Sequence, residues 1–293
     1  MSITKFLRHF SGAIFLLALV TFLFVYGWGT KTPEYVTDPP VDPIADEIEF
    51  MDLLHKTVEY GENSIDVFKF GYNAYDVQRV ANYYSYEHPE NAMYYDVYAV
   101  NRYAPASDYV ESIYLDTGRV AVAQGYANMI DQWSSNVILN MDPHLDDEQK
   151  VLWINQYIIE NYEYDDEDRN WDLADMLETG KGVCSGYTQM FTVLARKAGL
   201  EVSFAQSNTL NHVWNVVKVD GEWYNVDVTW NDSSGQDYMY LLLSDAEMQR
   251  RHELLGDNGT VSMQIYACST SRYDNIDQIW FADQSVFVSD IVS

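Results

Sequence analysis

Apolar and polar side chains between residues 48 and 145 follow short helical and strand-like patterns. Several segments alternate with the period of two that is typical of half-buried strands, and one has apolar residues at helical spacing until Pro89 ends it. The alternating segments are residues 64–72, 94–103 and 108–118, and the helical segment is residues 75–91. No acid, base and nucleophile are grouped in this part of the sequence. We therefore predict a small α+β lead-in domain over residues 48–145.

Two longer amphipathic helices are predicted within residues 146–293. Residues 146–163 have apolar side chains at intervals of three or four, and they begin with acidic residues, which the positive end of a helix dipole favours. Residues 184–198 repeat this spacing, and Gly199 is typical of the position after a helix end. The apolar positions are Val151, Ile154, Ile158 and Tyr162 in the first helix and Tyr187, Phe191, Leu194 and Ala198 in the second.

Residues 211–232 carry the strongest hairpin signal in the chain. Asp220 and Gly221 lie between two alternating runs, and this dipeptide is typical of a two-residue loop in which both residues need a positive φ. Such a loop pairs Val219 with Glu222. Counting back from that pair then sets the register of both strands.

This register places His212, Trp214 and Asp227 on one face of the hairpin, with Trp214 opposite Asp227. His212 and Asp227 become diagonal neighbours with Cα atoms ~7–8 Å apart, a gap that the two side chains can close. The sequence therefore predicts an imidazole oriented by a carboxylate, and a purely structural histidine is the alternative. The residues expected in the core on the opposite face are Val213, Val217, Val219, Tyr224, Val226 and Val228.

Cys184 follows a glycine-rich stretch and stands where the second predicted helix begins. The unpaired N–H groups and the dipole at that end stabilise a thiolate and lower the pKa of a thiol, and the same N–H groups can hold an oxyanion. A buried structural thiol and a disulfide with Cys268 are the alternatives. A domain of this size does not need a disulfide, and the alternating segment around Cys268 favours a small buried side chain.

Composition and charge restrict the class of protein and its partners. The 293 residues are 47% hydrophobic and 15% aromatic, which is enough for a substantial core and argues against a disordered chain. The formal charge of -28 comes from 45 acidic and 17 basic residues. Nucleic acids and anionic membrane surfaces are therefore poor partners, and cationic proteins or peptides are the favoured ones.

The N-terminal residues predict a membrane anchor and a spacer. An apolar run ends at Trp28, and as a helix it would be about 27 Å long, close to the thickness of a bilayer's hydrocarbon core. Basic residues precede the run and no small-x-small cleavage site follows it, which favours an uncleaved signal anchor over a removed signal peptide. We expect residues 1–9 in the cytoplasm, residues 10–28 across the cell membrane as a single pass, and a proline- and acid-rich linker at residues 29–47. Everything after Trp28 is then expected on the extracellular face.

Residues 165–172, DDEDRNWD, form a segment that we call the acidic loop. Carboxylate oxygens are calcium ligands, but the spacing is not that of an EF-hand and no glycine makes the turn, so a solvated loop is favoured. We predict no metal site and no cofactor.

Three segments, GKGVCSGYTQMFTVLARKAGL, HVWNVV and GEWYNVDVTW, together resemble the core of the transglutaminase-like superfamily, in a membrane-anchored bacterial form. The shared pattern is a cysteine at a helix start, a histidine followed by an aromatic residue and asparagine, and an aspartate before Thr-Trp. The resemblance covers residues 146–250 and implies a papain-like α+β fold, in which the helix of the nucleophile packs on an antiparallel sheet, for the domain at residues 146–293. It implies Cys184 as nucleophile, His212 as general base and acid, and Asp227 as the residue that orients His212.

The expected chemistry is acyl transfer through a thioester on Cys184, with the Cys184 backbone N–H as one oxyanion donor. Tyr164 is a candidate second donor and Trp214 a candidate wall of the acyl site, although tyrosine and tryptophan also pack in cores. Hydrolysis of peptide or amide bonds in proteins is favoured, because no feature marks a channel for a lysine substrate. A cross-linking transglutaminase with an amine acceptor and a catalytically silent binding or scaffold module are the alternatives.

Overall fold

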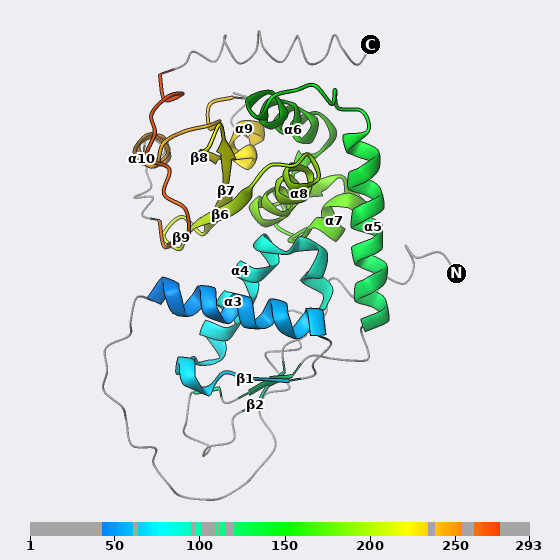
Figure 1. Cartoon of the computed structure of the whole chain (residues 1–293), viewed down its shortest axis with the longest axis vertical. Helices are drawn as coiled ribbons and strands as arrows, with labels where there is room; N and C mark the ends of the chain where they lie inside the picture. Colours follow the sequence, from blue (N-terminus) through cyan, green and yellow to red (C-terminus); the bar gives the residue numbers. More distant parts are fainter. Residues whose placement is uncertain are drawn as a thin grey trace, which may run out of the picture. The chain divides into compact units, whose positions relative to one another are not determined.

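The structure, a computed structural model, describes most of the chain between residues 43 and 275 (Figure 1). The described residues are 43–60, 64–94, 98–100, 109–110, 112–114, 120–233, 238–253 and 261–275. The membrane helix predicted at residues 10–28 lies outside them, as do residues 1–9 and the first part of the predicted linker. Within the described residues, no helix combines the length and the apolar character that crossing a membrane requires.

The described residues divide into two compact units. The first contains residues up to Ser85 and from Asn91 to Tyr126, and the second contains residues 86–90 and the chain from Ala127 onward. The division after Tyr126 falls inside helix α5, Val120–Ile138, a helix that the sequence patterns do not predict. The domain boundary predicted after residue 145 therefore lies beyond the end of α5.

The first unit contains helix α3, most of helix α4 and a small antiparallel sheet of strand order β1-β3-β2. Ile65 and Ile113 pair in this sheet and are both buried. The helices are α3, Pro43–Tyr60, and α4, Ala74–Glu87, and the 3₁₀ helices are η2, Phe68–Phe70, and η3, Pro89–Tyr94. The strands are β1, Ser64–Asp66, β2, Tyr98–Val100, and β3, Ser112–Tyr114.

Helix α3 corrects the predicted linker, because residues 43–47 belong to this helix. Pro43 stands at the first helical position, where a proline costs no hydrogen bond. Glu47 is buried and forms an ion pair with Arg79 of α4, with 2.8 Å between Oε1 and Nη2. An acidic residue that the composition assigned to a spacer is thus part of a packed helix. The prediction that α4 stops near Pro89 is confirmed.

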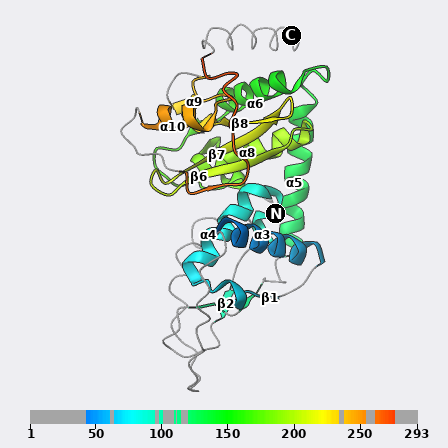
Figure 2. The same cartoon turned by 60° about the vertical axis from the view of Figure 1, so that its left-hand side comes forward.

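The second unit contains a four-stranded antiparallel sheet of order β8-β7-β6-β9, whose strands are labelled in Figure 1 and three of them, β6, β7 and β8, also in Figure 2. It also contains a short parallel pair, β4 and β5. The helices are α6, Asp147–Asn161, α7, Leu173–Thr179, α8, Cys184–Lys197, α9, Val228–Ser233, and α10, Asp245–Glu253. The strands are β4, Glu163–Tyr164, β5, Lys181–Gly182, β6, Val202–Ser207, β7, His212–Val219, β8, Glu222–Val226, and β9, Met263–Gln264.

Both amphipathic helices predicted in the second half of the chain are confirmed. Helix α6 starts with a capping box, in which the Asp146 side chain accepts from the N–H of Gln149 and the Gln149 side chain accepts from the N–H of Asp146. Helix α8 ends before Gly199, which has a φ of +85° and so takes the left-handed conformation that stops a helix.

The β7–β8 hairpin has the predicted register. Asp220 and Gly221 have φ values of 52° and 88°, as a two-residue loop of this kind requires, and Val219 pairs with Glu222. The pattern of the two strands therefore fixes which face each side chain takes.

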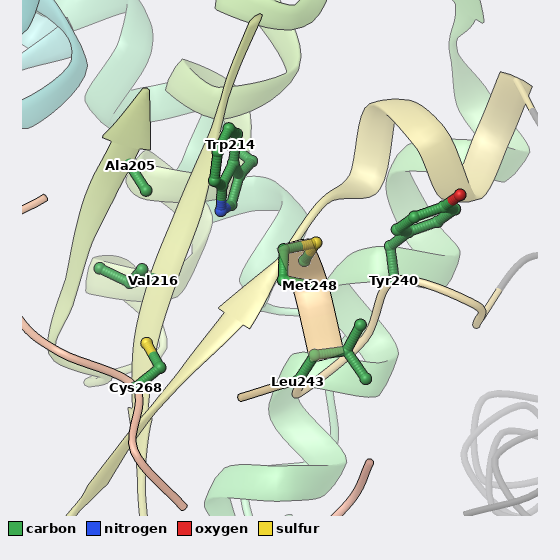
Figure 3. Close-up of a cluster of buried hydrophobic side chains, with 7 residues drawn as sticks. All are labelled: Ala205, Trp214, Val216, Tyr240, Leu243, Met248 and Cys268. Atoms are coloured by element: carbon green, nitrogen blue, oxygen red, sulfur yellow. The ribbon is translucent and has the colours of Figure 1, made fainter. Parts of the chain in front are cut away.

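Helix α8 packs on one face of the sheet, where the Asn215 Nδ2 donates to Thr192 Oγ1 (3.0 Å) and the Thr188 hydroxyl donates to the Val213 carbonyl (3.1 Å). The opposite face carries the buried cluster of Figure 3, which includes Cys268. Cys268 is fully buried and both cysteines are free, so the disulfide alternative is wrong. The other members of the cluster are Ala205, Trp214, Val216, Tyr240, Leu243 and Met248.

Candidate active site

Cys184 is the first residue of α8, and both of its neighbours are tied to the acidic loop. The Val183 N–H donates to the Asn170 carbonyl (3.0 Å), and the Ser185 hydroxyl donates to the Trp171 carbonyl. Cys184 itself is partly exposed, whereas most of α8 is buried. Cys184 therefore lies at a helix start, as the sequence pattern predicts, and it is partly exposed.

The acidic loop is folded around its own first carboxylate. Asp165 is 3% exposed and accepts hydrogen bonds from the backbone N–H groups of Glu167 (3.1 Å), Arg169 (3.0 Å) and Asn170 (3.0 Å). The prediction of a solvated loop is right for residues 166–169, which are exposed, and wrong for Asp165. Because Asp165 shapes the loop, it also places the carbonyl groups that hold the start of α8.

His212 and Asp227 meet at one end of the β7–β8 hairpin. His212 is the first residue of β7, Asp227 directly follows β8, and His212 Nε2 lies 2.7 Å from Asp227 Oδ2. The two side chains are 7% and 0% exposed. The structure thus brings together the imidazole and the carboxylate that the register predicts as diagonal neighbours.

Asp227 is held at both of its carboxylate oxygens. Oδ1 accepts from the Trp230 N–H (3.1 Å), so Asp227 caps the short helix α9, while Oδ2 accepts from the imidazole of His212. The Asp227 N–H donates to the Tyr240 carbonyl (2.8 Å). The carboxylate therefore has a fixed orientation before any substrate binds.

Burial and charge act in opposite directions on this pair. Burial alone lowers the pKa of His212, but the Asp227 carboxylate and the Cys184 sulfur outweigh it, so the pKa of His212 lies well above its usual value. Burial likewise raises the pKa of Asp227, and the charge of His212 together with the hydrogen bonds from His212 and His252 outweighs that effect and holds the pKa below its usual range. The pair therefore favours an imidazolium beside a carboxylate.

The side chain of Cys184 also lies near enough to the imidazole of His212 to be one of the groups that raise its pKa. Since Nε2 faces Asp227, Nδ1 is the ring nitrogen left for the thiol. A sulfur, an imidazole and a carboxylate thus stand in sequence, which is the order of a nucleophile, its base and the group that orients the base. The catalytic role of each residue stays a prediction.

Aromatic rings enclose the imidazole of His212. Trp214 stacks on it with ring centroids 5.8 Å apart, and Trp230 does so at 5.2 Å. Trp214 is 2% exposed, and its Nε1 donates to Asn225 Oδ1 (2.8 Å). Its place in the buried cluster of Figure 3 favours core packing over a role as a wall of the acyl site.

Tyr164 lies close to the thiol. It pairs with Gly182 in the parallel β4–β5 ladder, two residues before Cys184. Burial raises the pKa of Tyr164, and the nearby Cys184 and the carboxylates of the acidic loop raise it further. A protonated phenol beside the sulfur can donate a hydrogen bond, so Tyr164 remains the candidate second oxyanion donor.

His252 is the residue near this pair that the sequence patterns do not single out. It lies on α10, is fully buried, and its Nε2 is 3.2 Å from the same Asp227 Oδ2 that contacts His212. His252 stands just beyond the region of family resemblance, which ends at residue 250. No sequence pattern links it to His212 or Asp227, because α10 has no short-range connection to β7 or β8 in the sequence.

His212, Asp227 and His252 are the one group of described residues that offers three closely placed metal-binding atoms, which lie within 4.8 Å of one another. The Nε2 atoms of His212 and His252 are both at hydrogen-bond distance from Asp227 Oδ2, at 2.7 and 3.2 Å. We therefore describe the group as a hydrogen-bonded network and assign no metal to it.

Comparison with known proteins gives a family match over the same region. Residues 135–228 match the family model of the transglutaminase-like superfamily. The Kyphoscoliosis peptidase of Mus musculus is 27% identical over 141 residues, which are 41% of this chain and 20% of that protein. The Kyphoscoliosis peptidase of Homo sapiens is 29% identical over 122 residues, which are 34% of this chain and 18% of that protein.

The chain thus spans only a small part of the length of the curated relatives that it matches. Among solved structures, a protein described as a TGase has 17% sequence identity and a TM-score of 0.31, and the match covers 46% of this chain and 43% of that chain. The segment that matches the family model contains Cys184, His212 and Asp227. The chain therefore carries a domain of the transglutaminase-like superfamily at residues 135–228.

Proposed function

We propose that this chain is a cysteine-dependent acyl-transfer enzyme that hydrolyses peptide or amide bonds in proteins. The observation that carries the proposal is the hydrogen bond between His212 and Asp227, together with the place of Cys184 at the start of α8 beside that imidazole. His212 thus stands between a buried carboxylate and the sulfur of a partly exposed cysteine.

The first half of the reaction forms a thioester. The Cys184 thiolate, paired with protonated His212, adds to the carbonyl carbon of the substrate, and the tetrahedral oxyanion rests on the Cys184 backbone N–H. Tyr164 is the proposed second donor to that oxyanion. When the C–N bond breaks, the departing amine takes the proton of His212 and leaves the acyl group on the sulfur.

The second half of the reaction returns the enzyme to its starting state. Neutral His212 removes a proton from a water molecule, the resulting hydroxide adds to the thioester carbonyl, and the C–S bond breaks to release a carboxylic acid. Cys184 leaves as the thiolate and His212 is again protonated. Asp227 keeps its charge throughout and holds His212 in the orientation that both proton transfers need.

Hydrolysis is proposed over transfer to an amine because the curated relatives are named peptidases and because Cys184 is partly exposed. The relatives match over a small share of their length, so their name supports the reaction class alone. A silent scaffold would not need a cysteine at a helix start beside an imidazole that a buried carboxylate orients.

The test is to incubate the purified chain and its Cys184→Ala variant with a panel of peptides, with and without a primary amine, and to identify the products by mass spectrometry. We expect cleaved or deamidated peptides from the unchanged chain only. Incorporation of the amine in preference to water would favour a cross-linking transglutaminase. Identical products from both proteins over the whole panel would contradict the proposal.

The proposal includes a location, which rests on the sequence of residues 10–28. We propose that these residues anchor the chain in the cell membrane with the catalytic domain outside, where it acts on protein or peptide substrates. Carbonate extraction of membranes from expressing cells, followed by protease treatment of intact cells, tests this. We expect the chain to stay in the extracted membranes and to be cut from outside. Recovery of the uncut chain in the soluble fraction would contradict the location.

A further inference from the structure

Two imidazoles share one oxygen of Asp227. His212 Nε2 lies 2.7 Å and His252 Nε2 lies 3.2 Å from Asp227 Oδ2. The three side chains come from different elements, β7, the turn after β8, and α10. All three side chains are buried.

The tautomer of His252 follows from these contacts. An ionised carboxylate only accepts hydrogen bonds, so the proton of a neutral His252 ring must sit on Nε2. The other nitrogen, Nδ1, is buried and has no hydrogen-bond partner among the described residues. A second proton on Nδ1 would be an unpaired buried donor, and the neutral Nε2–H form avoids that cost.

The surroundings of His252 keep its ring in place. Trp230 and Trp214 meet its ring edge to face, with centroids 4.2 and 4.9 Å away. Helix α10 is anchored in turn, because its first residue, Asp245, accepts from Asn225 Nδ2 of β8 (2.9 Å). Met248, one turn before His252, is buried in the cluster of Figure 3.

We propose that His252 is a positioning residue. It holds the Asp227 carboxylate in the orientation that His212 needs, and so acts on Cys184 through Asp227 and His212. This inference rests on the proposed function, since it assigns His252 a part in preparing the same thiol. With His252 in place, Asp227 has three donors, two on Oδ2 and the Trp230 N–H on Oδ1.

Loss of the hydrogen bond from His252 would destabilise the buried negative charge of Asp227, which stabilises the protonated form of His212. Burial opposes the charge of Asp227, and the hydrogen bond from His252 is one of the interactions that lower the pKa of Asp227 against it. The titratable groups that face this network are His212 from β7, Cys184 from α8 through His212, and Tyr240 before α10. Arg251, next to His252 on α10, lies near Tyr240 and pairs with Glu247.

The direction of the effect follows from that balance. When Asp227 is a less stable anion, the imidazolium of His212 beside the sulfur is less stable too. The acid limb of the Cys184 alkylation rate should therefore move upward in pH. A side chain that only fills space on α10 would change the stability of the fold and leave this limb where it is.

The experiment measures the rate of Cys184 alkylation by limiting iodoacetamide between pH 4 and 8, on the full chain. Four proteins are compared: the unchanged chain, His252→Phe, which keeps a ring without the donor, His252→Gln, which restores an N–H at the same reach, and Met248→Ala. The last variant loosens α10 packing and keeps the hydrogen bond, so it reports the effect of destabilisation alone.

We expect the alkylation midpoint of His252→Phe to move upward by about one pH unit, which is about a tenfold lower rate on the acid limb. His252→Gln should recover most of the shift, and Met248→Ala should keep the original midpoint. An unmoved midpoint in His252→Phe, equal shifts in the Phe and Gln variants, or an equal shift in Met248→Ala would each overturn the proposal. Because alkylation needs no substrate, a failed search for substrates leaves this result unaffected.

A spectroscopic measurement on the unchanged chain gives an independent answer if His252→Phe does not fold. In protein labelled with ¹⁵N-histidine, we expect separate low-field proton signals for the Nε2–H groups of His212 and His252, each with contacts to tryptophan ring protons. A proton of His252 found on Nδ1 would overturn the proposal, because that tautomer cannot donate to Asp227.

Discussion

Asp227 decides the protonation and the orientation of His212. Its carboxylate accepts at both oxygens and is fully buried, so these hydrogen bonds come from within the protein. In Asp227→Asn the amide can present an N–H₂ group to His212, which then turns to the wrong tautomer. We expect the variant to fold and its kcat to fall on the order of 10³–10⁴-fold.

The measurement for Asp227→Asn is kcat on a peptide that the unchanged chain cleaves, with circular dichroism to check the fold. Asp166→Asn is the matched control, because Asp166 is an exposed aspartate of the acidic loop. We expect the control to keep its kcat within about twofold, as surface substitutions usually do. A similar kcat in Asp227→Asn and the control would show that His212 does not depend on this carboxylate.

The His212–Asp227 pair also predicts a window of pH in which it stabilises the fold. The pKa of His212 is raised on folding, so its contribution is complete below the unfolded value of about 6.5 and is lost as the pH rises toward the folded value. The pKa of Asp227 is lowered on folding, so its contribution is complete above about 3.9 and is lost as the pH falls. The pair should contribute most between pH ~4 and ~6.5.

Thermal unfolding of the chain and of His212→Gln between pH 4 and 9 measures this window. The difference in Tm should be largest between pH ~4 and ~6.5 and should shrink toward pH 9. The comparison between the two proteins removes the effect of the other acidic groups, which titrate in both. A difference that grows toward pH 9 would contradict the assignment of a raised pKa to His212.

At the scale of elements, the acidic loop supports the start of α8 through one buried carboxylate. Asp165 accepts from the N–H groups of Glu167, Arg169 and Asn170, and the Asn170 carbonyl accepts from the Val183 N–H just before Cys184. In Asp165→Ala these N–H groups lose their acceptor. We expect the free energy of unfolding to fall by about 2–3 kcal/mol, because backbone N–H groups that donate to a charged carboxylate would lose that acceptor.

Urea unfolding measures the stability of Asp165→Ala, and iodoacetamide alkylation measures whether Cys184 stays reactive. We expect slower alkylation as well as lower stability, since the loop no longer places the residue before α8. Asp166→Ala, one position along, should stay within about 0.5 kcal/mol of the unchanged chain. Equal stability of the two variants would show that the loop holds its shape without Asp165.

The local patterns predict the elements that carry their own signal. The Asp220–Gly221 turn fixed the register of β7 and β8, and with it the meeting of His212 and Asp227, because a two-residue loop leaves one pairing. The start of α8 at Cys184 followed from the spacing of its apolar residues.

Contacts between distant segments do not leave such a signal. His252 reaches Asp227 only because α10 returns across the sheet, and no period in the sequence specifies that return. Asp165 looks like any other member of an acidic run, and its burial depends on how the loop folds around it. Helix α3 was not predicted for a related reason, since Glu47 looks like a solvated acidic residue in the sequence and its burial depends on its distant partner Arg79.

At the scale of the whole molecule, charge separates classes of substrate. The chain carries a formal charge of -28, and exposed acidic residues of the loop beside Cys184 add a local negative field. Opposite charge raises the encounter rate of a substrate, and this effect weakens as salt shortens the range of the field. The proposed enzyme should therefore prefer peptides with lysine or arginine near the scissile bond.

Two peptides with the same scissile bond, one flanked by lysines and one by glutamines, test this preference at two salt concentrations. Between 0.1 M and 1 M salt the screening length falls from about 10 Å to about 3 Å, so we expect kcat/KM for the lysine peptide to fall roughly fivefold. The kcat/KM for the glutamine peptide should change little.

Replacing the exposed Asp166, Glu167 and Asp168 by their amides should reduce the preference for the lysine peptide while Cys184 keeps its alkylation rate, because these side chains act on the approach of the substrate. Equal salt dependence for both peptides would mean that the acidic surface has no part in choosing the substrate.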